Sequence, residues 1–367
     1  MTSRTLSGRA AGFSGLKAKR KQQTGPADAD GLTVTVLRSF RAFCAIEAEW
    51  RELFAAAAHP TPFLRHRWLR LSWELRAQRF PDRLRVILVR RHGVLMMAGA
   101  FVLGVRRLKP QFEFLASGTP QYHDLLWRPS DSTARQAELL LEALLTATLL
   151  QAKIATRYLR DISPLRPAMR AAGLERRVQH EWPSPYIALD AHADFAGYLG
   201  SLSPNLRNDH LRRLRRFADT GIDYALETGA AAREVVRWCF DSKRNWLDRT
   251  GQEADWLRNG HVDRFFAAFI EAGDDDAETW VASLRREGRI LAASLVFIER
   301  DAAFYSKITH DPEFASFSPG RTLTLLLVES AFERGLREFD LGVGALDWKQ
   351  RLRPTMRTSS IESIRLK

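Results

Sequence analysis

Apolar and polar positions follow the same pattern in two distant stretches of the chain. Residues 86–101 read VILVRRHGVLMMAGAF, and residues 281–296 read VASLRREGRILAASLV. In each stretch two apolar runs flank a polar segment that ends in glycine, which predicts a β-hairpin with its turn at His92-Gly93 or at Glu287-Gly288. Each hairpin is followed by a third strand, a long helical pattern and another strand. The repeated order predicts two α/β halves of similar architecture, each a mixed, largely antiparallel sheet flanked by helices.

Helical stretches precede both hairpins, at 42–57 and 66–79 in the first half and within 192–273 in the second. The segment EWPSPYIALD at 181–190 separates the halves, because two prolines interrupt a strand-like run. We therefore predict domains over 31–186 and 187–367. Residues 1–30 carry Arg or Lys at six positions and Asp at two, among Gly, Ala and Ser, which predicts a disordered basic leader.

The long helix of the second half begins without an acidic side chain. Its predicted first residues are Ser318, Pro319, Gly320, Arg321 and Thr322. The first backbone N–H groups of such a helix are available to an anion, so the stretch predicts a phosphate site, with an ordinary helix start as the alternative. The corresponding helix of the first half follows WRPSDST at 127–133, where Asp131 or Ser132 predicts a side-chain N-cap. The phosphate site is therefore predicted in the second half alone.

The overall charge fits an anionic ligand. The net charge is +13, which favours nucleic acid, acidic lipid, a polyanionic glycan or a phosphorylated cofactor as partner. The two cysteines, Cys44 and Cys239, lie in apolar helical patterns and predict free thiols in a reducing compartment. No run reaches the roughly 18 apolar residues of a membrane span. No metal-binding or nucleotide-binding motif occurs, so we expect no metal.

The order of elements resembles the core of the GCN5-related N-acetyltransferases (GNAT). The stretches SPGRTL at 318–323, EFDLGVGALDWKQRL at 338–352 and LSPNLRNDHLRRLRRF at 202–217 resemble the CelD/BcsL-type, Fem-related acetyltransferases, as does EWRELFAAAAHPTPFLRHRWLRLSW at 49–73. The resemblance implies tandem GNAT-like domains. It also implies acetyl-CoA or another acyl-CoA as co-substrate, with its pyrophosphate at the helix start and its pantetheine arm along the preceding strand.

The implied reaction is transfer of an acyl group to an amino group of a sugar, a polysaccharide precursor or another cell-envelope metabolite in the cytoplasm. The loop departs from the wider GNAT pattern because Gly320 is its single glycine. The donor therefore stays open between acyl-CoA and aminoacyl-tRNA, which the related Fem-type enzymes use. A non-catalytic protein that binds nucleic acid, and peripheral contact with a membrane, are further alternatives.

Helix 203–219 is predicted from Ser203 as N-cap and Pro204 in the first turn. On a helical wheel Arg207 falls inside the apolar arc, whereas the other arginines fall outside it and form a solvated basic face. An inward arginine needs an acidic partner or a bound anion, so Arg207 is either half of an ion pair or a substrate ligand. His210, on the same arc, is interpreted as a packed histidine.

Helix 233–249 has Lys243 in the middle of its apolar arc. Either its stem extends to solvent, or its ammonium group meets an acidic group of the acceptor in a cleft between the halves. Trp246 is either a core residue or a stacking surface for the substrate.

Three candidate catalytic residues follow along the second half. In the strand AAFYSKITHD, 302–311, alternation predicts Phe304, Ser306 and Ile308 on one face and Tyr305, Lys307 and Thr309 on the other. Tyr305 either reaches the reacting groups or packs in the core. Asp340 could orient or deprotonate the amine. Lys349 could balance charge there, or pair with an aspartate to fix the last turn.

Overall fold

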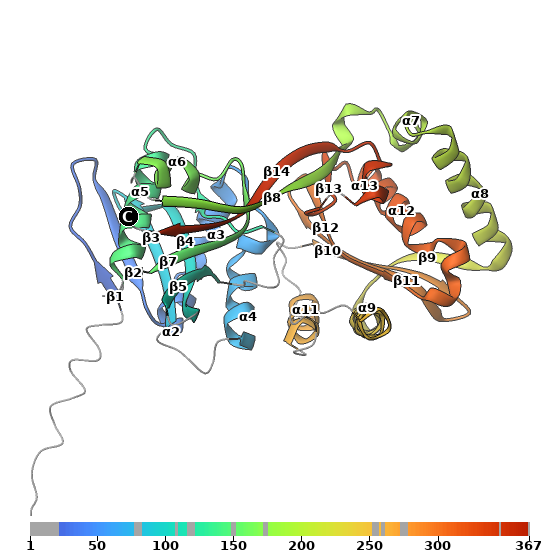
Figure 1. Ribbon diagram of the computed structural model, residues 1–367, viewed down its shortest axis with the longest axis horizontal. Coiled ribbons are helices and arrows are strands. Elements are labelled where there is room, and N and C mark those ends of the chain that lie inside the picture. The colour runs from blue at the N-terminus through green and yellow to red at the C-terminus, as the bar shows by residue number, and fades with distance from the viewer. Residues whose placement is uncertain are drawn as a thin grey trace, which may run out of the picture.

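The chain forms two lobes that lie side by side along the long axis of the molecule (Figure 1). The structure is a computed structural model, and it describes residues 22–76, 83–106, 109–115, 122–147, 152–171, 175–251, 257, 261–271, 278–344 and 346–365. The predicted leader therefore lies outside the described residues over 1–21. Its last part is ordered, because Gln22, Gln23 and Thr24 pair with the next strand, and the prediction of disorder is wrong there.

The N-terminal half contains, in chain order, β1 (Gln22–Thr24), β2 (Leu32–Leu37), α2 (Phe40–Cys44), α3 (Glu47–Ala56), η1 (Pro62–Leu64), α4 (His66–Arg76), β3 (Leu84–Arg91), β4 (Val94–Arg106), β5 (Lys109–Phe114), β6 (Leu126–Trp127), α5 (Thr133–Thr146), β7 (Lys153–Arg160), α6 (Leu165–Ala171) and β8 (Glu175–Ala188). The helical stretch predicted over 42–57 consists of two helices, α2 and α3. The helix predicted over 66–79 is described as far as Arg76.

The C-terminal half contains η3 (Leu189–Ala191), α7 (Phe195–Ser201), α8 (Pro204–Thr220), β9 (Ile222–Glu227), α9 (Gly229–Thr250), α11 (His261–Glu271), β10 (Glu278–Arg286), β11 (Arg289–Glu299), β12 (Ala302–His310), η4 (Pro312–Phe317), α12 (Pro319–Glu333), β13 (Glu338–Asp340), α13 (Asp347–Gln350) and β14 (Thr355–Arg365). The predicted start of α8 is confirmed, because the Ser203 side chain accepts a hydrogen bond from Leu206 N and Pro204 opens the helix.

The two halves repeat one arrangement, as the sequence predicts. In each, an antiparallel meander (β2–β5 or β9–β12) ends in a strand that pairs in parallel with the strand after the long helix: β5 with β7, and β12 with β13. Both predicted hairpin turns are present, and both residues of each turn have positive φ, from 49° at Glu287 to 84° at Gly93. The predicted fold class, a mixed sheet flanked by helices, is confirmed.

The last strand joins the halves into one sheet. The strands of this sheet lie in the order β1-β2-β3-β4-β5-β7-β14-β8-β13-β12-β11-β10-β9. In Figure 1, β8 and β14 run from one lobe into the other, and the C-terminus lies in the N-terminal lobe. The predicted boundary at 186 falls inside β8. Strand β14, which the sequence analysis assigned to the C-terminal domain, pairs with β7 over Ser359–Ile364 and with β8 over Thr355–Arg365.

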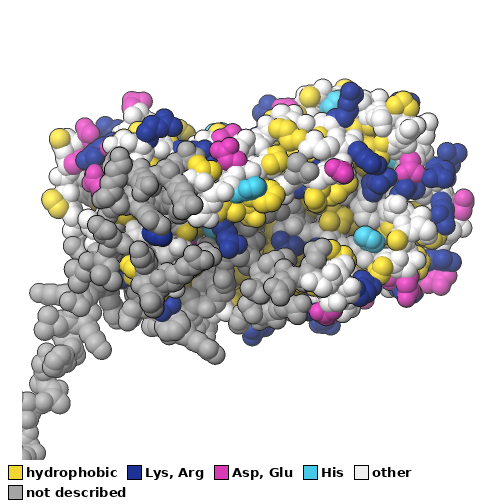
Figure 2. Space-filling view, in the orientation of Figure 1, with side chains coloured by type: hydrophobic (Ala, Val, Ile, Leu, Met, Phe, Trp, Pro, Cys, Tyr) yellow, Lys and Arg dark blue, Asp and Glu magenta, His cyan; other side chains and the backbone are white. Residues whose placement is uncertain are grey.

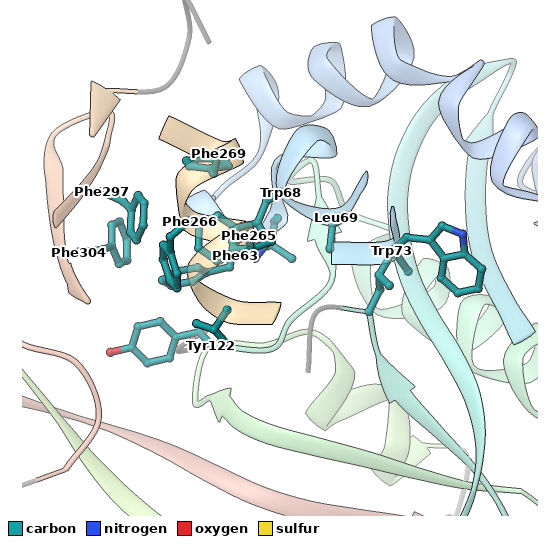
Figure 3. Packing of buried hydrophobic residues seen from close by; sticks show 14 of the residues in the cluster. Phe63, Trp68, Leu69, Trp73, Tyr122, Phe265, Phe266, Phe269, Phe297 and Phe304 are labelled. Atoms are coloured by element: carbon teal, nitrogen blue, oxygen red, sulfur yellow. The ribbon is translucent and has the colours of Figure 1, made fainter. Parts of the chain in front are cut away.

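An aromatic cluster fills the contact between the lobes below this sheet (Figure 3). Trp68 of α4 lies 4.7 Å from Phe265 and 4.9 Å from Phe269 of α11 between ring centroids, and 5.1 Å from Phe297 of β11. Trp68 has no exposed surface. Burial of rings this large is a major apolar contribution to stability, so the two halves share a core at this contact.

Candidate functional site

A pocket of about 640 Å³ lies where β12 ends and α12 begins. It is lined by Lys243, Trp246, Arg249, Tyr305, Ile308, Thr309, His310, Pro312, Ala315, Ser318, Pro319, Gly320, Arg321, Thr324 and Trp348. No carboxylate occurs among these described lining residues, whereas three of them carry a fixed positive charge. All of them belong to the C-terminal half. This pocket therefore does not form in the predicted cleft between the halves, where a smaller pocket of about 220 Å³ lies beside Arg65 and Glu299.

Strand β12 presents an open edge to the pocket. It pairs with β13 only through Ala302, Ala303 and Phe304. Beyond Asp340 the chain turns toward β8, where Leu341 N donates to Pro185 O. Among the described residues, 305–310 have no strand partner on this side. Backbone amide and carbonyl groups on such an edge can pair with an extended, amide-containing ligand.

A β-bulge changes which side chains of β12 face the pocket. Val296 is opposite Tyr305 and Leu295 is opposite Lys307, so Ser306 is an extra residue on this strand. One extra residue reverses the alternation of all side chains that follow. The predicted grouping of Phe304, Ser306 and Ile308 on one face is therefore wrong. The predicted grouping of Tyr305, Lys307 and Thr309 on the other face is wrong for the same reason.

The bulge divides the end of β12 between two helices. Thr309 Oγ1 lies 3.0 Å from Ser242 Oγ of α9, on one face of the sheet. On the other face, His310 Nδ1 lies 3.6 Å from the position that a side-chain Cβ on Gly320 would occupy. The pocket therefore has an α9 side and an α12 side, and the open edge of β12 runs between them.

The first turn of α12 has free backbone donors. Ser318 is its N-cap residue but makes no side-chain capping bond, and the first turn contains no acidic residue. Ser318 also has φ 45° and ψ 51°, a left-handed conformation that is costly for a residue other than glycine and is often kept at functional sites. A helix N-terminus of this kind is a suitable binding site for phosphate. Thr322, predicted with this group, is buried and does not line the pocket.

Tyr305 connects β12 to that first turn. Its hydroxyl lies 2.9 Å from Thr324 Oγ1, and Thr324 Oγ1 donates to Gly320 O at 3.0 Å. Because threonine has one hydroxyl proton, Tyr305 is the donor in the first of these bonds. Burial raises the pKa of the Tyr305 phenol, which keeps it neutral. Tyr305 lines the pocket, and its hydroxyl supports the turn that presents Gly320.

Asp340 and Lys349 are not among the lining residues. Asp340 is 3% exposed, accepts from Tyr122 Oη at 2.9 and 2.8 Å, and accepts from Gly342 N at 2.6 Å. Burial raises the pKa of Asp340 to about 6. Lys349 is also buried, and its Nζ donates to Gly342 O at 3.0 Å and to Val343 O at 3.1 Å. Both residues fix the chain where it leaves β13, and this geometry does not favour their predicted catalytic roles.

The basic helix α8 contacts the chain before α12 through Arg213 and not through Arg207, and neither arginine lines the pocket. Arg207 is half-buried and donates to Gly200 O at 3.4 Å, outside the pocket. The Arg213 side chain is 15% exposed, donates to Phe317 O at 3.4 Å and pairs with Asp209 at 2.8 Å. The predicted inward position of Arg207 is therefore wrong. The inward row of α8 is Leu206, His210, Arg213 and Phe217, at alternating spacings of four and three residues; the three other than Arg213 are buried. His210 is buried as predicted.

Lys and Arg side chains appear over the part of the right-hand lobe where α8 lies (Figure 2). Arg216, predicted to be solvated, lies over the Phe317 ring at 3.7 Å from its centroid, beside the start of α12. Arg321 pairs with Asp209 at 3.4 Å. Sequence reasoning placed Lys243, Trp246 and Arg321 in the site, and all three line the pocket.

Sequence reasoning missed other lining residues, among them a further arginine, a histidine and a further tryptophan. Arg249 lies six positions after Lys243 on α9, a spacing that the sequence shows. His310 and Trp348 also line the pocket, and only the bulge and the path after β13 bring them there.

Comparison with known families identifies this part of the chain. Residues 204–350 match the family model described as an acetyltransferase (GNAT) domain. This stretch is a GNAT-type acetyltransferase domain. It contains β12, the open edge and α12. A comparison with curated proteins gives no significant match.

Solved structures share the fold over most of the chain. FemX is similar with a TM-score of 0.61 and 14% sequence identity, covering 87% of this chain and 95% of FemX. L-PGS from Bacillus licheniformis has a TM-score of 0.54 and 13% identity, covering 87% and 91%. The C-terminal domain of a putative lysylphosphatidylglycerol synthetase from Agrobacterium fabrum has a TM-score of 0.53 and 13% sequence identity, and the match covers 89% of this chain and 93% of that domain. At these identities the likeness shows the fold alone.

The GNAT domain makes the protein an acyltransferase enzyme and implies acyl-CoA as co-substrate. The pocket fits that ligand. The α12 amides suit its pyrophosphate, the β12 edge suits the amides of its pantetheine arm, and no lining carboxylate repels it. Within the described ranges, no three His, Cys, Asp or Glu side chains gather as a metal site requires. Of the helices that the structure describes, none has the length and apolar character needed to cross a membrane.

Proposed function

We propose that the protein transfers an acetyl or longer acyl group from acyl-CoA to an amino group of a sugar, a polysaccharide precursor or another cell-envelope metabolite, as a CelD/BcsL-type enzyme of the cytoplasm. One observation carries the proposal: the open edge of β12 leads directly to the uncapped start of α12, in a pocket whose described lining residues include no carboxylate. The choice of acceptor rests on the sequence resemblance, and the cytoplasmic location is consistent with the free thiols of Cys44 and Cys239.

The residues of the pocket bind and orient the reactants. Amides of the first turn of α12 hold the pyrophosphate, Arg321 adds charge, and the β12 edge aligns the arm so that the thioester lies near Tyr305. A neutral amine attacks the thioester carbonyl, the C–N bond forms, and the C–S bond breaks. The amine proton passes through water to the departing sulfur, which leaves as the thiol of CoA; the described lining offers no carboxylate base.

Aminoacyl-tRNA is the second candidate donor. The observation that favours it is the row of arginines on α8, of which Arg213 and Arg216 contact Phe317 beside the pocket. A basic surface beside a transfer site suits a polyanionic donor, and binding would then fall steeply with salt. Salt-dependent binding of nucleic acid without any transfer activity would support a non-catalytic protein that binds nucleic acid.

A thermal-shift comparison tests the proposal. Acetyl-CoA, a longer acyl-CoA and transfer RNA are added separately to the purified protein, because a ligand that binds only the folded state raises its melting temperature. We expect a rise with acyl-CoA. Gly320→Asp should abolish it, since a carboxylate about 5 Å from the pyrophosphate costs roughly 3 kcal/mol per charge pair.

Gly320→Ala is the matched control. Its Cβ would lie 3.6 Å from His310 Nδ1 and 3.7 Å from Ile308 Cδ1, which are ordinary contacts, so the shift with acyl-CoA should remain. A rise with transfer RNA and none with acyl-CoA would replace the first donor by the second. An equal shift in wild type and Gly320→Asp would show that the donor binds elsewhere.

A further inference from the structure

The α9 side of the pocket is chemically distinct from the α12 side. The sheet separates the two helices, because Phe304 of β12 packs in the core that contains α9, whereas Tyr305 packs in the core that contains α12. The α12 side already supplies the phosphate-binding amides. The α9 side contributes Lys243, Trp246 and Arg249 to the pocket, and it remains for the second substrate.

Lys243 is a half-buried cation without an acceptor among the described residues. The titratable groups that interact electrostatically with Lys243 are the Cys239 thiol, Lys307 and His310, and none of them is a carboxylate. Burial lowers the pKa of Lys243. Removing an ammonium group from water is costly unless an anion compensates for it.

Nearby acidic residues of α9 do not supply that anion. Asp241 is bound by Arg244 at 2.6 Å, and Arg244 also binds Asp263 of α11 at 3.3 Å. Arg249, six residues further along α9, also lines the pocket, is exposed and likewise has no acceptor among the described residues. The face of α9 toward the pocket therefore carries two uncompensated cations, about 9 Å apart along the helix axis.

Trp246 lies between these cations and is 44% exposed. An indole ring that is partly open to a pocket offers a flat surface on which a sugar or other ring can pack. A cation on each side of it fits a ring-shaped molecule that carries negative charge.

We propose that the α9 side is the acceptor subsite and that the acceptor is an amine carrying a phosphate or carboxylate group. Its anionic group binds Lys243, with Arg249 as a second contact, and its ring packs on Trp246. This inference rests on the proposed function, since it assigns the donor to α12. It narrows the acceptor from amines in general to acidic amines, for example an acidic amino sugar.

The first experiment needs no turnover. Binding of CoA is measured by calorimetry, and inorganic phosphate is then titrated into the CoA-saturated protein. We expect phosphate to bind, with affinity reduced about tenfold or more in Lys243→Gln because a charge-assisted bond is lost. Arg237→Gln is the control, since Arg237 is exposed on α9 and does not line the pocket. It should bind phosphate as wild type does. Absence of phosphate binding, or equal loss in both variants, would overturn the assignment.

The second experiment separates phosphate from carboxylate. Glucosamine, glucosamine 6-phosphate and muramic acid compete with inorganic phosphate on the CoA-saturated protein. We expect at least one acidic amine to compete about tenfold better than glucosamine, and Lys243→Gln to remove that preference while CoA affinity changes less than twofold. Equal competition by glucosamine would refute an acidic acceptor. Loss of CoA affinity in Lys243→Gln would place Lys243 on the donor side. Failure of CoA to bind wild type would instead count against the proposed function.

Discussion

Tyr122 makes a buried hydrogen bond that connects the two halves, and its removal should weaken the protein in a pH-dependent way. Its hydroxyl donates to both carboxylate oxygens of Asp340, at 2.9 and 2.8 Å, across 218 positions of sequence. Both residues are at most 3% exposed. Tyr122→Phe keeps the ring and deletes only this donor. Asp340 then retains Gly342 N at 2.6 Å as a donor.

The expected loss follows from the charge of the acceptor. Hydrogen bonds to charged groups contribute about 1.5–3 kcal/mol, and those between neutral groups contribute about 1 kcal/mol. Since burial raises the pKa of Asp340 to about 6, the carboxyl group is ionised at pH 8 and protonated at pH 5. Tyr122→Phe should therefore lower the free energy of unfolding by about 2 kcal/mol at pH 8 and by about 1 kcal/mol at pH 5.

Urea denaturation at the two pH values measures both losses. Tyr198→Phe is the matched control, because the Tyr198 hydroxyl is buried and donates at 3.0 Å to the neutral acceptor Leu352 O. Tyr198→Phe should lower the free energy of unfolding by about 1 kcal/mol at both pH values. In an Asp340→Asn background, the loss caused by Tyr122→Phe should no longer depend on pH. If Tyr122→Phe costs the same at pH 5 and pH 8, an ionised Asp340 is not its partner.

Three further predictions concern stability. Burial lowers the pKa of His210 to about 4, so the unfolded state binds more protons than the folded state between pH 4 and 6.5, and stability falls as the pH drops through this range. His210→Leu should recover up to about 3 kcal/mol of the free energy of unfolding, measured by urea denaturation at pH 4. An acid transition that is unchanged in the variant would contradict this. Burial lowers the pKa of Lys307 to about 8, so the unfolded state binds more protons between pH 8 and 10.5 and stability should rise across this range. Lys307→Met should flatten that rise in urea denaturation, and an unchanged rise in the variant would contradict this. The fragment 31–186 lacks β13 and β14, which leaves β8 unpaired and one edge of β7 open. It should therefore elute as aggregates in size-exclusion chromatography, and a folded monomer would favour the predicted boundary.

Local signals in the sequence determined the repeated elements and the start of the candidate donor site. The turns at His92-Gly93 and Glu287-Gly288 adopt positive φ because Gly, and to a lesser extent a polar residue before it, tolerates that conformation. Ser203 and Pro204 define the start of α8 for similarly local reasons. The uncapped start of α12 at Ser318 also follows from neighbouring residues alone. Such features depend on a few adjacent residues, so the sequence is sufficient to predict them.

The tertiary structure alone decided which side chains meet. The extra residue Ser306 in β12 depends on pairing with β11, and it reverses the faces of all later residues in the strand. The bond from Tyr122 to Asp340 and the position of β14 between β7 and β8 depend on segments more than 150 positions apart. Periodicity shows that a strand has two faces, but not which partner covers each face. That choice is made by packing and hydrogen bonding between distant segments, which is why Asp340 was expected in the site and is instead buried against Tyr122.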